Sequence, residues 1–151
     1  MIQSIFIREA KESDIPILID YNRALAYETE NIILDENTLK LGIAKVLELE
    51  GCQYFVAELK SKIVGQSMLT SEWSDWRNGV IWWIQSVYVN PDHRQQGVFQ
   101  SILKYIEALA EKHPEVKGLR LYVKQDNKVG VSVYESLGIK NSGYLIHEKY
   151  R

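Results

Sequence analysis

The chain has 151 residues, of which 46% are hydrophobic and 25% charged, a balance typical of one globular domain spanning residues 1–151. Its net charge of −2, with 18 Lys and Arg spread along the chain, gives no global attraction to nucleic acid or to an anionic membrane. A lone cysteine, Cys52, excludes an intramolecular disulfide. With neither a signal peptide nor a membrane-spanning apolar run in view, we expect a cytoplasmic protein.

The first half of the chain alternates between extended and helical patterns. Ser13 or Asp14 is suited to cap a helix whose first turn contains Pro16, where no intrahelical N–H is needed. A second helical pattern ends near Gly51. The expected elements are a strand at 2–8, a helix after residue 14, a helix at 36–49, and strands at 53–59 and 62–71 joined by a tight turn.

The second half opens with Asn78-Gly79, a strong hairpin signal. Residues 129–134 are ambiguous, because valines alternating with other residues favour a strand, whereas the sequence that follows is typical of the end of a helix. The other expected elements are strands at 80–89, 119–123 and 144–150 and a helix at 98–112. Together these elements predict an α/β or α+β domain with a mixed sheet.

Residues 87–103 carry the strongest functional signal. They read as a strand, a turn broken by Pro91, and Gly97 at the start of an amphipathic helix. The first amides of such a helix lack intrahelical partners, and the helix dipole adds partial positive charge. The segment therefore predicts a binding site for a phosphate-bearing cofactor.

Three motifs in series resemble the GNAT superfamily of acyl-CoA-dependent N-acetyltransferases. They are Arg94-Gln95-Gln96-Gly97-Val98-Phe99, the segment from Asn127 through Tyr134-Glu135-Ser136-Leu137-Gly138-Ile139, and the opening Ile7-Arg8-Glu9-Ala10. The resemblance implies a GNAT-like α+β fold with a mixed, mostly antiparallel sheet of six to seven strands and about four helices. It also implies that residues 129–134 are helical. The Gly-Val-Phe triplet, with the stretch at 72–77, resembles a subgroup of that superfamily.

Two residues depart from the superfamily pattern. Phe99 replaces a small residue, so its ring either packs into the core or crowds the cofactor's pyrophosphate. Its helical spacing with Ile102, Leu103 and Ile106 favours the core. Gly130 replaces a helical alanine, at a cost of about 1 kcal/mol in helix propensity.

The resemblance further implies a reaction, which is transfer of an acetyl group from acetyl-CoA to a primary amine of a small molecule or peptide. We expect direct transfer in a ternary complex, because Cys52 lies outside the signature segments. A splay between the strand at 87–89 and the strand at 119–123 would open the cleft, and an amide near Val87 would polarise the thioester carbonyl. The expected cofactor-binding residues are Val87, Tyr88, Val89, Arg94, Gln95, Gln96, Gly97, Val98, Phe99, Gln100 and Asn127. Arg94 is otherwise a solvated turn residue, and Asn127 otherwise serves only as a helix cap.

The expected general acid is Tyr134, whose phenol is protonated at neutral pH and can donate to the leaving thiolate. The alternative is a packed ring with its hydroxyl at the surface. For the base, Glu28 and Glu72 are the candidates, although each is otherwise a solvated charge. The expected acceptor-binding residues are Glu30, Trp73, Trp76 and Trp83. The tryptophans would form an aromatic wall or, alternatively, fill the core and a dimer contact.

The sequence also leaves other functions and partners open. The histidines lack the spacing of metal ligands, so no metal site is expected. Neither a nucleic-acid partner nor a membrane partner is expected, and a homodimer is an expectation from the superfamily alone. A non-catalytic acyl-CoA sensor and a purely structural homodimer are the rival functions. The acceptor is not identified by the sequence.

Overall fold

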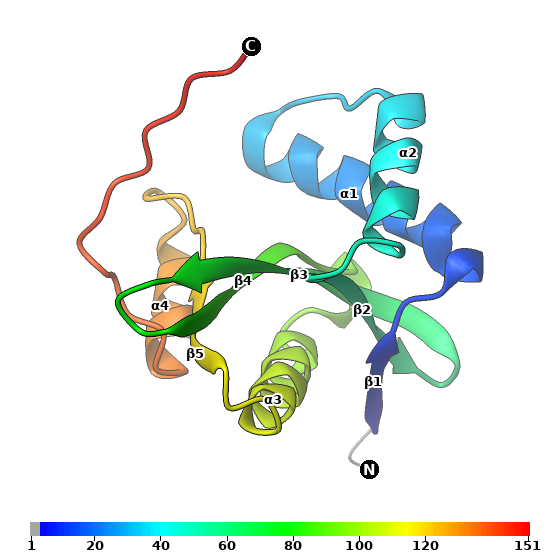
Figure 1. Ribbon diagram of the computed structural model, residues 1–151. Coiled ribbons are helices and arrows are strands. Elements are labelled where there is room, and N and C mark those ends of the chain that lie inside the picture. Colours follow the sequence, from blue (N-terminus) through cyan, green and yellow to red (C-terminus); the bar gives the residue numbers. More distant parts are fainter. Residues whose placement is uncertain (1–3) are drawn as a thin grey trace.

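A five-stranded sheet, in the order β1-β2-β3-β4-β5, organises the computed structural model, which describes residues 4–151 (Figure 1). The strands are β1 (Ile5–Glu9), β2 (Cys52–Leu59), β3 (Lys62–Ser74), β4 (Gly79–Val89) and β5 (Val116–Leu121). Neighbours from β1 to β4 pair antiparallel, and β5 pairs parallel with β4. The mixed, mostly antiparallel sheet is confirmed. The expected count of six to seven strands is wrong for residues 4–151, because residues 144–150 pair with no strand.

Within residues 4–151, four α-helices surround this sheet, as expected. The helices α1 (Ile15–Glu30) and α2 (Glu36–Val46) cover one face, and α3 (Val98–Glu111) covers the other (Figure 1). The fourth, α4 (Lys128–Ser136), follows β5, so residues 129–134 are helical as the family resemblance implied. Short 3-10 turns, η1 (Glu12–Asp14) and η2 (Pro91–His93), precede α1 and follow β4. No helix among residues 4–151 is both long enough and apolar enough to cross a membrane.

Local sequence explains most of the chain reversals. Lys60 and Ser61 both have positive φ, as a two-residue turn between β2 and β3 requires. The β3–β4 turn is wider than expected, because Ser74 pairs with Gly79 and leaves four residues between them. Asp14 precedes α1, but its side chain does not cap that helix. Its carboxylate instead accepts bonds from the Lys11 amide and from the Arg8 guanidinium, at 2.8 and 2.7 Å.

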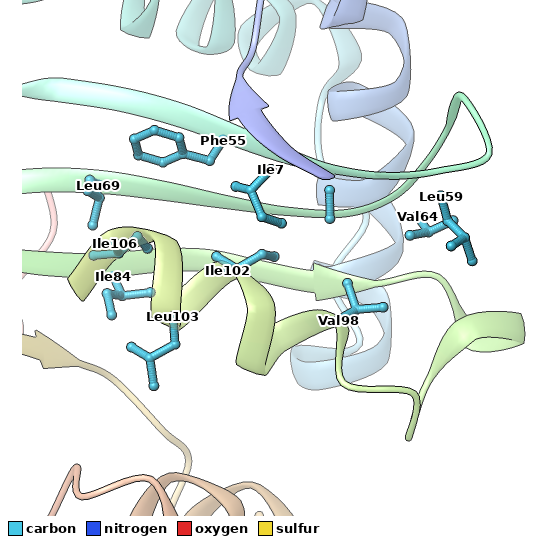
Figure 2. Packing of buried hydrophobic residues seen from close by; sticks show 11 residues of the cluster. Ile7, Phe55, Leu59, Val64, Leu69, Ile84, Val98, Ile102, Leu103 and Ile106 are labelled. Atoms are coloured by element: carbon cyan, nitrogen blue, oxygen red, sulfur yellow. The ribbon is translucent and has the colours of Figure 1, made fainter. Parts of the chain in front are cut away.

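The larger hydrophobic core lies between the sheet and α3 (Figure 2). Val98, Ile102, Leu103 and Ile106 are all at most 2% exposed, and their spacing is that of one helix face. They pack against strand residues that include Ile7, Phe55, Val64 and Ile84. A second, smaller cluster joins α1 and α2 to the opposite face of β2. The main core therefore fixes the start of α3 against the end of β4, where the sequence predicts the cofactor site.

Candidate functional site

The sheet opens at the end of β4. The pairing of β4 with β5 ends at Ile84 and Leu121, while β4 itself continues to Val89. Within residues 4–151, the stretch 85–89 has no strand beside it on the β5 side. The expected splay is therefore present, and it exposes the backbone of one edge of β4 beyond Ile84.

A group of unbonded amides lies next to this opening. Gly97 caps α3 with φ at 80°, and Gln95 also has a positive φ, at 62°. These two left-handed residues turn the chain sharply from η2 into α3. Within the described part of the chain, the amides of residues 95–100 have no hydrogen-bond acceptor. We call these six residues the amide cradle. Its donors and the helix dipole suit a phosphate or pyrophosphate.

Gly65 on β3 lets the amide cradle sit close to the sheet. A Cβ on Gly65 would lie 2.8 Å from Val98 Cγ1 and 3.3 Å from the carbonyl oxygen of Tyr88. Any larger residue would therefore push the first turn of α3 away from β4. No local pattern in the sequence marks Gly65, because the contact depends on the strand register and on the position of α3.

Tyr134 reaches the amide cradle through Phe99. The two rings meet edge to face, with their centroids 5.3 Å apart. Phe99 also packs against the main core, which is the arrangement that its spacing favoured. Burial raises the pKa of the Tyr134 phenol above its ordinary value, so the hydroxyl is protonated at neutral pH. Tyr134 thus has the protonation state that a general acid needs.

Asn127 holds the start of the helix that carries Tyr134. Its Oδ1 accepts a hydrogen bond from the Gly130 amide at 3.0 Å, which confirms its capping role. A Cβ on Gly130 would lie 2.6 Å from Asn127 Nδ2. The glycine that weakens the helix on propensity is therefore the residue that makes room for its cap.

Arg94 lies between α1 and β4. Its guanidinium donates to both carboxylate oxygens of Glu28, at 3.2 and 3.1 Å, and its Nε donates to the carbonyl of Val89 at 3.0 Å. The same group lies over the ring of Tyr88, 5.3 Å from the centroid. Burial raises the pKa of Tyr88, and the nearby Glu28 carboxylate raises it further. Arg94 therefore positions Glu28 beside the open end of β4.

A buried glutamine on β3 fixes a bulge in β4. The register of β3 and β4 shifts between Gln66 and Met68, and Ser86 in the shifted stretch has φ at 50°. Gln66, which is fully buried, donates from Nε2 to the Ser86 carbonyl at 3.0 Å. Ser67 Oγ donates to the neighbouring Gln85 carbonyl at 3.2 Å. These bonds fix the backbone immediately before Val87. Gln66 and Ser67 were not recognised from the sequence, which carries no signal for the bulge.

Glu72 forms a separate cluster farther along the sheet. Its Oε1 accepts from the Trp83 indole at 3.1 Å, and its Oε2 accepts from Arg120 at 2.8 Å. The Trp83 ring stacks on that of Tyr122, with centroids 4.5 Å apart. We call Glu72, Trp83, Arg120 and Tyr122 the Trp83 cluster. It lies on the sheet face that α1 and α2 cover farther along.

The four tryptophans do not share one surface. Trp82 packs against the main core, whereas Trp83 points to the opposite sheet face. Trp73 pairs across from Val80, on the Trp82 face, and is 63% exposed, while Trp76 in the turn is 87% exposed. The single aromatic wall expected from the sequence is therefore not assembled. Glu30 ends α1, is exposed, and forms no ion pair within residues 4–151.

A separate hollow lies between β1, α1, α2 and β2. It measures about 390 Å³ and is lined by residues of β1, α1, α2 and β2, including Glu9, Ile15, Leu47, Cys52 and Tyr54. None of the residues assigned above to the amide cradle or to the Trp83 cluster lines it. This hollow is therefore separate from the candidate site.

Comparisons with known proteins agree with this geometry. The Acetyltransferase (GNAT) family matches residues 17–139. The chain is 28% identical over 148 residues to the thialysine N-epsilon-acetyltransferase of Bos taurus, a match that covers 91% of this chain and 85% of that protein. It is 39% identical to a possible acetyltransferase from Clostridium difficile 630, with a TM-score of 0.89 and 97% of both chains covered.

A predicted acetyltransferase from Clostridium acetobutylicum, solved with acetyl-CoA, is more distant in sequence. It is 18% identical, covers 97% of this chain and 96% of its own, and has a TM-score of 0.79. At that identity the likeness is one of fold. The shared fold is the one that brings the end of β4 and the start of α3 together.

Proposed function

Since this chain belongs to the GNAT acetyltransferase family and is an acetyl-CoA-dependent N-acetyltransferase, we propose that it acetylates a primary amine by direct transfer in a ternary complex. The acceptor is a small molecule or a peptide. The observation that carries the proposal is the meeting of the amide cradle with Tyr134 where β4 and β5 part.

The residues at the candidate site suit acetyl-CoA as the acetyl donor. The amides of residues 95–100 have no acceptor in the described chain and lie at a helix N-terminus, which suits a pyrophosphate. The unpaired edge of β4 at Val87, Tyr88 and Val89 offers backbone groups to an extended amide-bearing arm. Acetyl-CoA, when bound, supplies the acetyl group as a thioester. An amide near Val87 then donates to the thioester carbonyl, as an oxyanion donor does.

The transfer forms one bond and breaks another. The amine nitrogen attacks the acetyl carbon, the new C–N bond replaces the C–S bond, and the sulfur leaves as a thiolate. Tyr134 donates its phenolic proton to that sulfur; a tyrosine phenol is protonated at neutral pH, and burial raises the pKa of Tyr134 further. A base accepts the proton that the amine loses. Cys52 has no part in this scheme, since it lies at the start of β2, in the wall of the separate hollow.

The strand register favours Glu28 over Glu72 as the base that accepts the proton of the amine. Glu72 pairs with Ile81, six positions before Val87, which corresponds to about 20 Å along the strand. Glu28 instead lies beside Tyr88 and Arg94, at the end of β4 itself. We assign proton acceptance to Glu28, directly or through water. We assign Glu72 to binding of the acceptor amine, because it orients the side chains of Arg120 and Trp83.

The relative in Bos taurus guides the choice of acceptors. Its name specifies acetylation of the terminal amine of thialysine, a lysine analogue. A primary amine on a short flexible chain is therefore the first class to test. The Trp83 cluster, with one carboxylate, one guanidinium and two aromatic rings, offers contacts to the distal part of such an acceptor.

The experiment measures thiol release from acetyl-CoA against a panel of thialysine, lysine, a polyamine, an aminoglycoside and a peptide with a free N-terminus. Both substrates are varied, and the protein is examined by mass spectrometry after incubation with acetyl-CoA alone. Direct transfer predicts intersecting double-reciprocal lines and an unmodified protein. Parallel lines with an acetylated protein would overturn direct transfer. Thermal stabilisation by CoA without thiol release on any amine would point to a sensor.

A further inference from the structure

The bulge in β4 places a serine in a conformation that serine rarely adopts. Two residues of β4, Ser86 and Val87, lie opposite the single residue Ser67 of β3. Ser86 has φ at 50°, in the left-handed region, where a Cβ is crowded and glycine is the usual residue. A strained conformation of this kind persists only where the surrounding structure imposes it. The contacts of Ser86 therefore show what imposes its conformation.

Two buried side chains hold Ser86 from the face of the sheet that α1 and α2 cover. Gln66 is fully buried and donates from Nε2 to the Ser86 carbonyl at 3.0 Å. Tyr54, which is 4% exposed, has its hydroxyl within hydrogen-bonding reach of the Ser86 side chain. The same hydroxyl accepts a hydrogen bond from Asn22 Nδ2 at 3.1 Å, and Asn22 belongs to α1. Ser86 is therefore tied at its carbonyl to β3 and at its side chain, through Tyr54, to α1.

Gln66 is poorly suited to a purely structural role. Within residues 4–151, its Oε1 is buried and has no hydrogen-bond partner. A buried amide oxygen left unpaired costs at least as much free energy as one hydrogen bond from Nε2 contributes. Methionine has a similar volume and carries no amide, so it would fill the same position without that cost. What Gln66 provides is therefore the conformation of Ser86 rather than stability.

The bond from Gln66 also sets the direction of the next amide. The carbonyl of Ser86 and the N–H of Val87 belong to one planar peptide unit, and this peptide is trans. In a trans peptide the C=O and N–H bonds point in opposite directions, so the Val87 amide points away from Gln66. Gln66 belongs to β3, and the opposite edge of β4 is the one that β5 leaves open beyond Ile84. Holding the carbonyl thus turns the amide toward the open cleft.

We propose that Gln66 and Tyr54 are positioning residues of the acetyl transfer, which hold Ser86 so that the Val87 amide is aimed at the thioester carbonyl. The inference rests on the proposed function, in which that amide is the oxyanion donor. A hydrogen bond weakens steeply as its angle departs from linear, and the developing oxyanion depends on it more than the thioester does. The expected effect of losing Gln66 is therefore on the chemical step. Binding of acetyl-CoA to the amide cradle does not involve Gln66.

The first test is the infrared carbonyl band of bound acetyl-CoA, isotope-labelled at the thioester carbonyl, in the wild type and in Gln66→Met. A hydrogen bond to a carbonyl lowers its stretching frequency, so the wild type should move the band below its position in solution. Gln66→Met should return the band most of the way. Its kcat should fall about tenfold at an unchanged KM for acetyl-CoA. Urea unfolding should show that the variant is at least as stable as the wild type.

Matched variants separate positioning from a general loss of structure. Gln53→Met is the same substitution on β2, where Gln53 is exposed and its amide donates to Glu9 rather than to the bulge. It should change neither the band nor kcat. Tyr54→Phe should act in the same direction as Gln66→Met. Tyr21→Phe removes a buried hydroxyl that donates to the Ile63 carbonyl at 2.7 Å, and it should leave both quantities unchanged. The two tyrosine variants also decide the question if Gln66→Met does not fold.

A glycine at position 86 tests the physical cause within the same site. Glycine adopts a positive φ without strain, so Ser86→Gly should lessen the need for the bond from Gln66. Gln66→Met should therefore lower kcat less in the Ser86→Gly background than in the wild type. An equal loss in the two backgrounds would show that Gln66 does not act through the conformation of Ser86.

The outcomes distinguish this inference from the proposed function. An unchanged carbonyl band in Gln66→Met would overturn the inference, as would a fall in kcat without a change in the band. A wild type that acetylates an amine while the carbonyl keeps its solution frequency would also overturn it, and acetyl transfer itself would stand. A band that is lowered through Gln66, in a protein that acetylates none of the amines, would support the inference and contradict the proposed function.

Discussion

The ring of Phe99 meets the ring of Tyr134 edge to face, with 5.3 Å between centroids and 70° between the ring planes. Phe99 belongs to the first turn of α3, whose amides form part of the amide cradle, and Tyr134 belongs to α4. The contact therefore links the part of the site assigned to phosphate with the residue assigned to proton transfer. Edge-to-face contacts of this kind contribute about 1 kcal/mol and fix the orientation of both rings.

Tyr134→Phe should lower kcat about tenfold and leave the KM for acetyl-CoA nearly unchanged. The substitution removes the phenolic proton but keeps the ring that packs on Phe99. Steady-state thiol release measures both constants. Tyr105→Phe is the control, because this ring of α3 packs on Phe55 in the main core and should leave kcat unaffected. An unchanged kcat in the Tyr134 variant would remove this residue from the mechanism.

Phe99→Leu should lower the free energy of unfolding by about 1 to 2 kcal/mol, because the ring contact with Tyr134 is lost. It should also lower kcat, since Tyr134 is held less firmly, while the affinity for CoA stays the same. Calorimetric titration with CoA measures that affinity. Phe6→Leu, a substitution at an exposed position of β1, should change neither the free energy of unfolding nor kcat. Tighter CoA binding by the Phe99 variant would show that the ring crowds the pyrophosphate.

Gly65→Ala should weaken CoA binding about tenfold and destabilise the fold by about 1 to 3 kcal/mol. The added Cβ would lie 2.8 Å from Val98, so the amide cradle must move away from β4. Gly42→Ala in α2 is the matched control. Its Cβ would meet nothing within 4 Å, and the gain in helix propensity should stabilise the protein by about 1 kcal/mol. Equal CoA affinity in both variants would contradict the role given to Gly65.

Asp14→Asn should destabilise the protein at neutral pH by about 2 kcal/mol, measured by urea unfolding. Asp14 is 7% exposed as a side chain, and the bonds that it accepts from Arg8 hold its pKa below the ordinary value of 3.8. A lowered folded pKa means that the stabilisation is fully present above about pH 3.8 and is lost as the pH falls through the folded value. The difference between wild type and variant should therefore be constant at neutral pH and shrink in acid.

The control for this prediction is Asp35→Asn. Asp35 caps α2 through the Thr38 amide, and Asn caps a helix equally well, so stability at neutral pH should hardly change. A difference for Asp14→Asn that stays constant down to the acid unfolding transition would show that the Arg8 pair is not its origin.

Much of the fold follows from patterns that are local in sequence. The spacing of Val98, Ile102, Leu103 and Ile106 predicted the buried face of α3, because a helix repeats every 3.6 residues. The helix at 128–136 was different. Its valines and Gly130 favour a strand locally, and only the resemblance to the family predicted a helix. The Asn127 cap, for which Gly130 leaves room, stabilises the start of this helix.

The candidate site was predicted only in part. The amide cradle follows from residues adjacent in sequence, whereas the pair of Arg94 with Glu28 joins residues 66 positions apart. Gly65 and Gln66 act through strand register, which no local pattern fixes. The close spacing of the tryptophans in the sequence wrongly suggested one shared aromatic surface. Adjacent strand residues such as Trp82 and Trp83 point to opposite faces, so proximity along the chain does not place them together.

The most direct measurement is the backbone amide spectrum of the isotope-labelled protein during titration with CoA. The central claim is that the amides of residues 95–100 bind the pyrophosphate beside Tyr134. It predicts that the largest shifts fall on those six amides and on residues 87–89, and that Gly65→Ala reduces them. Shifts confined to the hollow lined by Ile15, Leu47 and Cys52, with the amides of residues 95–100 unmoved, would contradict it.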